Sequence, residues 1–260
     1  MKLHFKSSKH KQAKKLFKSL YFNTKVKKMA TKGKQIEVHM EDSNKKTHKI
    51  SVDRVLVSIG RSPNTTDIGL DNTDVKLDEK GFIQVDNTQQ TAAANIYAIG
   101  DVSGGILLAH KASKEAKIAV ENIKDEGSTT DNMIIPAVVF TDPDVAWCGL
   151  TETEAKEKGI EVKVAKFPWA ASGRALTLNR TDGLTKLIIE PGTERILGVG
   201  LVGVGAGELI AQGTLAVEMG ITAEDLALTI HPHPTLSETM MESAEVFYGH
   251  SAHAYTPKKK

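Results

Sequence analysis

The sequence predicts a mixed chain of 260 residues, in which an α/β part is followed by an α+β part. The α/β prediction rests on the apolar run Ile96–Ile99, which leads into Gly100-Asp101 and then into an amphipathic segment at His110–Asn122. A strand, a polar turn and a helix in this order form the βα arrangement that places ligands at the carboxyl ends of strands. The α+β prediction rests on a change after Asn132, where short apolar runs that suit antiparallel pairing stand beside grouped helical segments.

The α/β part starts with strand-like patterns. Alternating apolar residues predict strands at Gln35–Met40 and Thr47–Val52, and the continuous apolar run Val55–Ile59 predicts a buried strand. The glycine and proline within residues 60–64 stop that strand sharply. Another short strand is predicted at Phe82–Val85, before the strand–turn–helix unit.

The α+β part is predicted from about residue 134. Strands at Ile135–Phe140 and Val145–Cys148 flank Thr141-Asp142-Pro143-Asp144, a hairpin-type turn. Thr151–Glu154 is a capping box, which starts a short helix that ends near Gly159. The remaining predicted elements are strands at 161–167, 185–190 and 196–202 and helices at 207–219, 223–228 and 236–247.

Residues 198–203 fit the dinucleotide-binding pattern G-x-G-x-x-G. In a true fingerprint the first glycine lies in the turn after a strand, and the third glycine opens the helix. Here the apolar run Ile196–Val204 continues through all three glycines, and the helical pattern begins only after Gly205-Ala206-Gly207. The segment is therefore predicted to be a buried strand and not a phosphate-binding loop.

Composition narrows the classes of function. Lys+Arg 34 against Asp+Glu 32 give a net charge of +2, although residues 1–30 contain 10 lysines and no acid. We interpret these lysines as a solvated helix face, because no aromatic or base-reading motif supports nucleic-acid binding. No apolar run is long enough to span a bilayer, and no metal site is predicted. Cys148, the single cysteine, is predicted to be a buried structural thiol, which fits a reducing, cytoplasmic location.

The segment His231–Glu238 carries the clearest chemical signal. His233 stands five residues before Glu238, between two prolines that restrict the backbone. A carboxylate that orients one ring nitrogen makes a histidine a useful proton acceptor near neutral pH. Thr235-x-x-Glu238 ahead of an apolar-periodic run is also the pattern of a capping box. On these residues alone both interpretations stay open, and His231 is interpreted as a loop histidine.

A set of longer strings identifies a family. They are VLVSIGRSPN at 55–64, NIYAIGDV at 95–102, LAHKA at 108–112, VAWCGL at 145–150, KFPWAASGR at 166–174, HPHPTLSE at 231–238 and AEVFYG at 244–249. From about Phe22 to the C-terminus the chain closely resembles the C-terminal half of the dihydrolipoamide dehydrogenases, which are flavin-dependent disulfide reductases. KFPWAASGRA and HPTLSE favour this family over the related glutathione and mercuric reductases. The lysine-rich start has no convincing counterpart.

The resemblance implies a role for each matching residue. His233 is expected to take a proton from a dihydrolipoamide thiol and Glu238 to orient it, at the disulfide of the other subunit of a homodimer. Asp101 is expected to hydrogen-bond the ribityl chain of FAD, whereas its pattern alone indicates a turn aspartate. Arg61 could equally be a surface arginine in a linker. The expected flavin-side residues are Leu107, Leu108, Ala109 and His110, and the expected NAD-side residues are Val26, Ser58, Ile59, Gly60 and Arg61.

The resemblance also implies domain boundaries. Residues 1–64 are expected to be the remainder of an NAD-binding domain, 65–133 an FAD-domain segment, 134–250 a complete α+β dimerisation domain and 251–260 a basic tail. The two nucleotide-binding segments are thus partial Rossmann-like pieces. The C-x4-C redox pair and both glycine fingerprints of the family do not occur in this sequence. We therefore expect the complete reaction to need a separate N-terminal fragment and the partial domains to expose apolar edges.

Two hypotheses from different classes follow. In the first, the chain is a component of a cytoplasmic flavoprotein oxidoreductase that converts dihydrolipoamide and NAD⁺ into lipoamide and NADH and serves a 2-oxo acid dehydrogenase complex. In the second, it is a non-catalytic remnant that only folds and dimerises. Neither hypothesis involves nucleic acid or a membrane.

Overall fold

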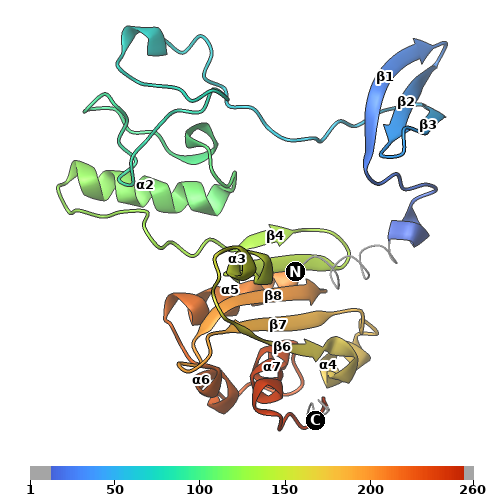
Figure 1. Cartoon of the computed structure of the whole chain (residues 1–260), viewed down its shortest axis with the longest axis vertical. Helices are drawn as coiled ribbons and strands as arrows, with labels where there is room; N and C mark the ends of the chain where they lie inside the picture. Colours follow the sequence, from blue (N-terminus) through green and yellow to red (C-terminus); the bar gives the residue numbers. More distant parts are fainter. Residues whose placement is uncertain (1–12, 255–260) are drawn as a thin grey trace. The chain divides into compact units, whose positions relative to one another are not determined.

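The computed structural model describes residues 13–254. These residues belong to two compact units, one of residues 13–64 and one that starts at residue 65. Figure 1 shows a small antiparallel sheet in the first unit and a larger sheet with helices in the second. Among residues 13–254 no helix is long and apolar enough to cross a membrane.

The first unit is a three-stranded antiparallel sheet in the order β1-β2-β3. Gly33, at φ +64°, lies in the turn between the first two strands. Alternation along the central strand buries Val38 and Met40. The strands predicted at 35–40 and 47–52 are confirmed. The bounds are β1 Thr24–Lys32, β2 Gln35–Asp42 and β3 Thr47–Val52.

The lysine-rich start does not form a single helix face, so this prediction was wrong. Residues 13–16 are helical, but Lys25, Lys27 and Lys28 lie exposed in β1. β1 is an edge strand of its sheet, and lysines are common on such edges because they discourage pairing with other chains. The lysines of residues 1–12 lie outside the described residues.

The predicted buried strand at Val55–Ile59 was also wrong. These residues are neither paired nor buried, and Leu56 and Ile59 are 92% and 94% exposed. A β-strand is stabilised by hydrogen bonds to a neighbour, and no strand within residues 13–254 pairs with this segment. Its apolar composition therefore produces an exposed apolar linker here.

Residues 65–133 contain one long helix, α2 (Ala109–Ile123), which confirms the predicted helix. The strands predicted at 82–85 and 96–99 reduce to isolated bridges, so those predictions were wrong. The carboxylates of Asp78 and Asp86 accept backbone N–H groups two and four residues ahead. Such local bonds favour turns over regular ladders. Two 3₁₀ turns, η1 (Leu70–Asn72) and η2 (Gly100–Ser103), complete this segment.

Residues 134–254 contain a five-stranded antiparallel sheet in the order β4-β5-β8-β7-β6. Helix α5 packs on β5 and β8, and helix α7 packs on β6 and β7 (Figure 1). The capping box predicted at Thr151–Glu154 is present and begins α3. The bounds are β4 Ala137–Val139, β5 Asp144–Gly149, α3 Glu152–Glu157, β6 Lys163–Pro168, η3 Trp169–Ala171, α4 Gly173–Thr177, β7 Leu184–Ile189, β8 Ile196–Gly203, α5 Ala206–Glu218, α6 Ala223–Leu228 and α7 Glu238–Tyr248.

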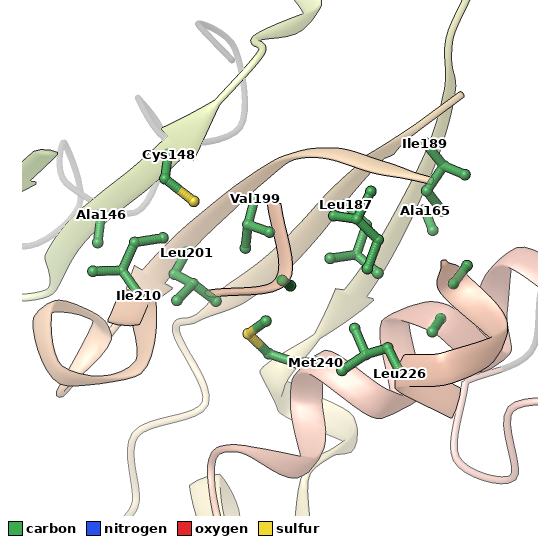
Figure 2. Close-up of a cluster of buried hydrophobic side chains, with 14 of the residues drawn as sticks. Ala146, Cys148, Ala165, Leu187, Ile189, Val199, Leu201, Ile210, Leu226 and Met240 are labelled. Atoms are coloured by element: carbon green, nitrogen blue, oxygen red, sulfur yellow. The ribbon is translucent and has the colours of Figure 1, made fainter. Parts of the chain in front are cut away.

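The main core lies between this sheet and its helices (Figure 2). Leu187 and Leu201 of the central strands pack with Leu226 of α6 and Met240 of α7, and all four are buried. Cys148 belongs to the same core, as predicted, and its burial raises the pKa of the thiol. The mixed α/β architecture confirms the predicted fold class.

The three glycines of the G-x-G-x-x-G match lie within β8, as predicted. A Cβ atom added to Gly198 would lie 2.0 Å from the carbonyl oxygen of Leu150. A Cβ atom added to Gly203 would lie 2.0 Å from the ring of Trp169, which is fully buried. These glycines therefore allow close packing of backbone and indole against the strand.

Candidate functional site

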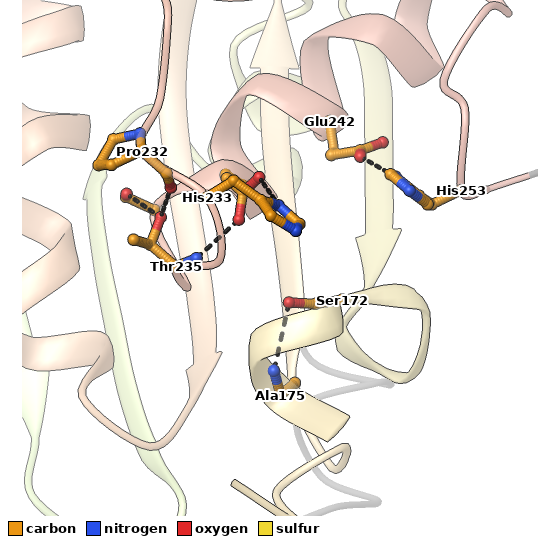
Figure 3. Close-up of polar contacts among 9 residues, drawn as sticks. Ser172, Ala175, Pro232, His233, Thr235, Glu242 and His253 are labelled. Atoms are coloured by element: carbon orange, nitrogen blue, oxygen red, sulfur yellow. Dashed lines mark hydrogen bonds and ion pairs between the residues drawn. The ribbon is translucent and has the colours of Figure 1, made fainter. Parts of the chain in front are cut away.

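His233 and Glu238 meet at the start of α7, where Figure 3 labels the ring of His233. The Nδ1 atom of His233 lies 2.8 Å from Oε1 of Glu238. The other carboxylate oxygen, Oε2, accepts the backbone N–H of Thr235 at 2.7 Å. When Nδ1–H donates to the carboxylate, the lone pair of the ring is left on Nε2, which is the arrangement of a general base.

The two interpretations of this segment turn out to be compatible. The Glu238 side chain makes the half of a capping box that accepts a backbone N–H near the helix start. The other half is absent from the described contacts, because the Thr235 hydroxyl donates to the carbonyl of Pro232 and pairs with Ser237. One carboxylate thus stabilises the helix start with one oxygen and orients the imidazole with the other.

The electrostatics keep Glu238 ionised. Partial burial pushes the pKa of Glu238 upward, but the hydrogen bond from the Thr235 N–H and the nearby His233 ring outweigh it and lower the pKa. The side chain of Glu238 is 19% exposed, whereas that of His233 is 72% exposed. The carboxylate is therefore fixed within the protein and the imidazole is presented to whatever approaches this surface.

A cavity of about 180 Å³ lies beside the pair. One wall consists of residues from α7 and the preceding loop. Gly173, at the start of α4, belongs to the facing wall, and a Cβ atom added to it would lie 4.0 Å from the ring carbon Cε1 of His233. The lining residues are Phe167, Ala171, Ser172, Gly173, Leu176, His233, Glu238, Thr239, Glu242 and His253.

Sequence reasoning missed Glu242 and His253 in this cavity. Glu242 hydrogen-bonds Nδ1 of His253, so a second histidine–carboxylate pair adjoins the first (Figure 3). One signal was available, because Glu242 follows Glu238 by four residues and must share its helix face. His231, by contrast, has both ring nitrogens occupied, by Gln212 at 2.7 Å and by the carbonyl of Thr229 at 2.8 Å.

Asp101 lies exposed on η2, in a loop that α2 holds in place. Glu115 of α2 accepts the backbone N–H of Gly100 at 2.7 Å, and Lys111 donates to the carbonyl of Gly104 at 3.0 Å. Residues 107–110 follow the loop, with Leu108 at the N-cap of α2. His110 is bonded through Nε2 to the carbonyl of Pro136 at 2.7 Å.

The expected NAD-side residues lie in the first unit. Val26 is an exposed residue of β1, and residues 58–61 belong to the exposed, extended segment after β3. The expected catalytic base His233, its partner Glu238 and the expected flavin-side residues all lie in the second unit. The structure therefore places His233 against Glu238, and separately places η2, which carries Asp101, against α2.

Two protein-family models match this chain. The model described as pyridine nucleotide-disulphide oxidoreductase matches residues 8–116, and the dimerisation domain of the same family matches residues 135–244. The first match includes the whole of the first described unit, and the two matches together include most of the second.

Curated relatives agree with the two family models. A dihydrolipoyl dehydrogenase of Thermus scotoductus is 52% identical over 205 residues, which are 79% of this chain and 44% of the relative. One from Buchnera aphidicola subsp. Schizaphis graminum is 46% identical over 240 residues, which are 92% of this chain and 50% of the relative. The chain thus spans about half the length of the curated relatives that it matches.

Solved structures extend the likeness to the fold. LpdA from Mycobacterium tuberculosis superposes with a TM-score of 0.83 at 27% identity, over 91% of this chain and 51% of LpdA. The flavoprotein disulfide reductase RclA from Escherichia coli superposes with a TM-score of 0.76 at 31% identity, over 83% of this chain and 49% of RclA. The matching family models, relatives and folds agree, and the chain belongs to the pyridine nucleotide-disulphide oxidoreductase family.

Proposed function

We propose that this chain is a component of a dihydrolipoyl dehydrogenase, in which dihydrolipoamide and NAD⁺ give lipoamide, NADH and a proton. The observation that carries the proposal is the hydrogen bond between Nδ1 of His233 and the largely buried carboxylate of Glu238. This hydrogen bond leaves the lone pair of the ring on Nε2. Because the ring is exposed, a thiol of the substrate can reach that atom. His233 is the proposed proton acceptor, and Glu238 stabilises the imidazolium that forms.

The redox disulfide is assigned to a polypeptide segment outside these 260 residues. Cys148 is the only cysteine in this sequence and is buried in the core, so a disulfide cannot form within the chain. The dimerisation domain supports a homodimer in which His233 serves the disulfide of the second subunit. A 2-oxo acid dehydrogenase complex is the proposed destination of the enzyme, and a cytoplasmic location suits the unpaired thiol.

FAD contacts are proposed for Asp101 and residues 107–110. Asp101 is exposed at η2, and the N-cap residue of α2, Leu108, has an apolar side chain that makes no cap hydrogen bond. A helix start of this kind suits a partly anionic flavin ring. FAD, when bound, would carry electrons between the disulfide and NAD. Val26 and residues 58–61 are the proposed edge of the NAD site, where their exposure leaves them accessible.

The first test is flavin retention. The chain is incubated with FAD and passed through gel filtration, and the visible spectrum of the protein peak is recorded, alone and with an N-terminal portion of a relative that carries the missing motifs. We expect retained flavin with that portion present, together with NADH formation from dihydrolipoamide. Asp101→Asn should reduce retention, and Asp125→Asn, an exposed turn residue, should not. A colourless, inactive mixture would contradict the proposal and leave a remnant that only folds and dimerises.

A further inference from the structure

The cavity beside His233 holds a second histidine–carboxylate pair that the proposed proton transfer does not use. Glu242, on α7, binds Nδ1 of His253 through Oε1 and accepts the hydroxyl of Ser251 through Oε2 at 2.6 Å. The side chain of Glu242 is 7% exposed and that of His253 is 59% exposed. A buried carboxylate that accepts hydrogen bonds from two donors is held in a fixed position and is not a chance contact at the surface.

The two pairs have the same construction. In both, the carboxylate belongs to α7 and the histidine, which lies outside the helix, contributes its Nδ1 atom. Glu238 and Glu242 are one helical turn apart, so their side chains lie on one face of α7. Both histidines and both carboxylates line the same cavity, and Figure 3 shows the two rings on the same side of α7.

We propose that Glu242 and His253 are positioning residues, whose combined charge sets how readily His233 accepts a proton. The inference rests on the proposed role of His233 as the base and adds residues that tune it. Charges that share a partly buried cavity interact more strongly than they do in open water. When protonated His253 and ionised Glu242 cancel each other's charge, Glu238 is the one negative charge among the described residues of the cavity that acts on His233. When Glu242 has lost this partner, it adds a second negative charge that favours the imidazolium of His233.

The charges around His253 come from one helix. The hydrogen bond to Glu242 and the negative charge of that residue raise the pKa of His253, with smaller contributions from Glu238 and Glu245. The opposite wall, formed by the lining residues of β6, η3 and α4, contributes no charged side chain to the cavity within the described chain. The raised pKa keeps more of His253 protonated at pH values where an ordinary histidine has lost its proton. The positive charge of His253 then balances the negative charge of Glu242.

The test is an NMR titration of the histidine Cε1 protons in the chain itself. In His253→Asn, Glu242 loses its counter-charge, so the midpoint of the His233 signal should move upward by on the order of half a pH unit. In the double variant Glu242→Gln, His253→Asn, the extra negative charge is gone and the midpoint should return toward that of the unmodified chain. This return separates an electrostatic effect from a structural one.

His250→Asn is the matched control. His250 stacks on Tyr248 just beyond α7 and does not line the cavity, so its removal should leave the His233 midpoint in place. Thermal unfolding of each variant verifies that it is folded. An unmoved midpoint in His253→Asn, or a shift that persists in the double variant, overturns the inference.

The titration and the enzyme assay fail independently. The midpoint of His233 is measured without flavin, disulfide or turnover, so it tests the coupling of the two pairs alone. If the coupling is found but the reconstituted mixture makes no NADH, the proposed function fails and the coupling stands. Where activity is restored, the acidic limb of its pH profile should move in the same direction as the NMR midpoint in His253→Asn.

Discussion

Lys111 and Glu115 form an ion pair on α2, with 2.6 Å between Nζ and Oε1 and side chains only 8% and 5% exposed. Each partner also binds the backbone of the loop that presents Asp101, Glu115 at Gly100 and Lys111 at Gly104. A buried pair whose remaining hydrogen bonds are satisfied resists loss of either member, because the other charge would then be buried alone.

We therefore predict that Glu115→Gln destabilises the second unit by about 3–5 kcal/mol. Chemical denaturation followed by circular dichroism measures the change. The comparison is Glu126→Gln, which breaks the exposed pair Lys124–Glu126 and should cost less than about 1 kcal/mol. Equal effects of the two variants would contradict the claim that burial makes the first pair important.

His233→Gln should affect catalysis without affecting folding. In an enzyme restored with the missing N-terminal motifs, loss of the base should reduce the rate of dihydrolipoamide oxidation on the order of 10²–10⁴-fold. The side chain is 72% exposed and its pairing with Glu238 adds little stability, so the unfolding temperature should change only slightly. His231→Gln is the control, since both ring nitrogens of His231 serve structural bonds. It should retain most of the activity and lose some stability.

The stability contributed by Glu238 should depend on pH. Its pKa in the folded chain is below the ordinary 4.5, so the ionised form stabilises the fold above that pH, and the stabilisation is lost as the pH falls through the folded value. The difference in unfolding free energy between the unmodified chain and Glu238→Gln should therefore be constant near neutrality and shrink below pH 4.5.

Glu245 should show the opposite sign and serves as the internal control. Burial and the neighbouring Glu242 raise the pKa of Glu245, so its ionisation opposes folding. Glu245→Gln should raise the unfolding free energy at neutral pH and lose this advantage as the pH falls. The same pH trend in both variants would contradict these assignments.

Gly198→Ala should be strongly destabilising. The added methyl group would lie 2.0 Å from the carbonyl oxygen of Leu150, which is backbone and cannot rotate away. Overpacking of a core commonly costs about 1–3 kcal/mol, and a backbone collision belongs at or beyond the upper end. Gly159→Ala has open space around it and pays only for its positive φ, about 1 kcal/mol. A smaller loss at Gly198 than at Gly159 would refute the steric explanation.

The exposed segment at residues 55–59 should limit solubility. Leu56 and Ile59 are almost fully exposed, and contiguous exposed apolar side chains promote association. Leu56→Ser with Ile59→Ser should raise the concentration at which the chain begins to aggregate in light scattering. The unfolding temperature should not change, because neither side chain is packed. Unaltered aggregation would show that apolar surface other than residues 55–59 causes the association.

The sequence predicts best where local pattern and tertiary packing agree. Strands β5 to β8 and helices α5 to α7 have apolar faces that are covered by one another, so periodicity placed them within a few residues. Residues 55–59 failed for the opposite reason. An apolar run specifies a strand only when a neighbouring strand is present to pair with it, and none pairs with it in the described part of the chain.

The candidate site was predicted to a similar degree. The spacing of His233 and Glu238 left a helix cap and a histidine–carboxylate pair both open, and only the family resemblance pointed to the pair, whose contact the structure contains. The second pair was not predicted, since His253 lies eleven residues from Glu242 and reaches it only because the chain turns back after α7. No periodic pattern encodes such a return of the chain.

The two carboxylate oxygens of Glu238 have different roles, one in folding and one in holding His233, and this division has an evolutionary consequence. One oxygen supports the start of a helix that packs on the central sheet, and the other holds the imidazole. Selection for folding alone would retain this carboxylate, and the histidine beside it would keep its partner long after turnover ceased to matter. The persistence of such a pair in a lineage therefore dates the loss of activity poorly, and a silent descendant can look chemically competent for a long time.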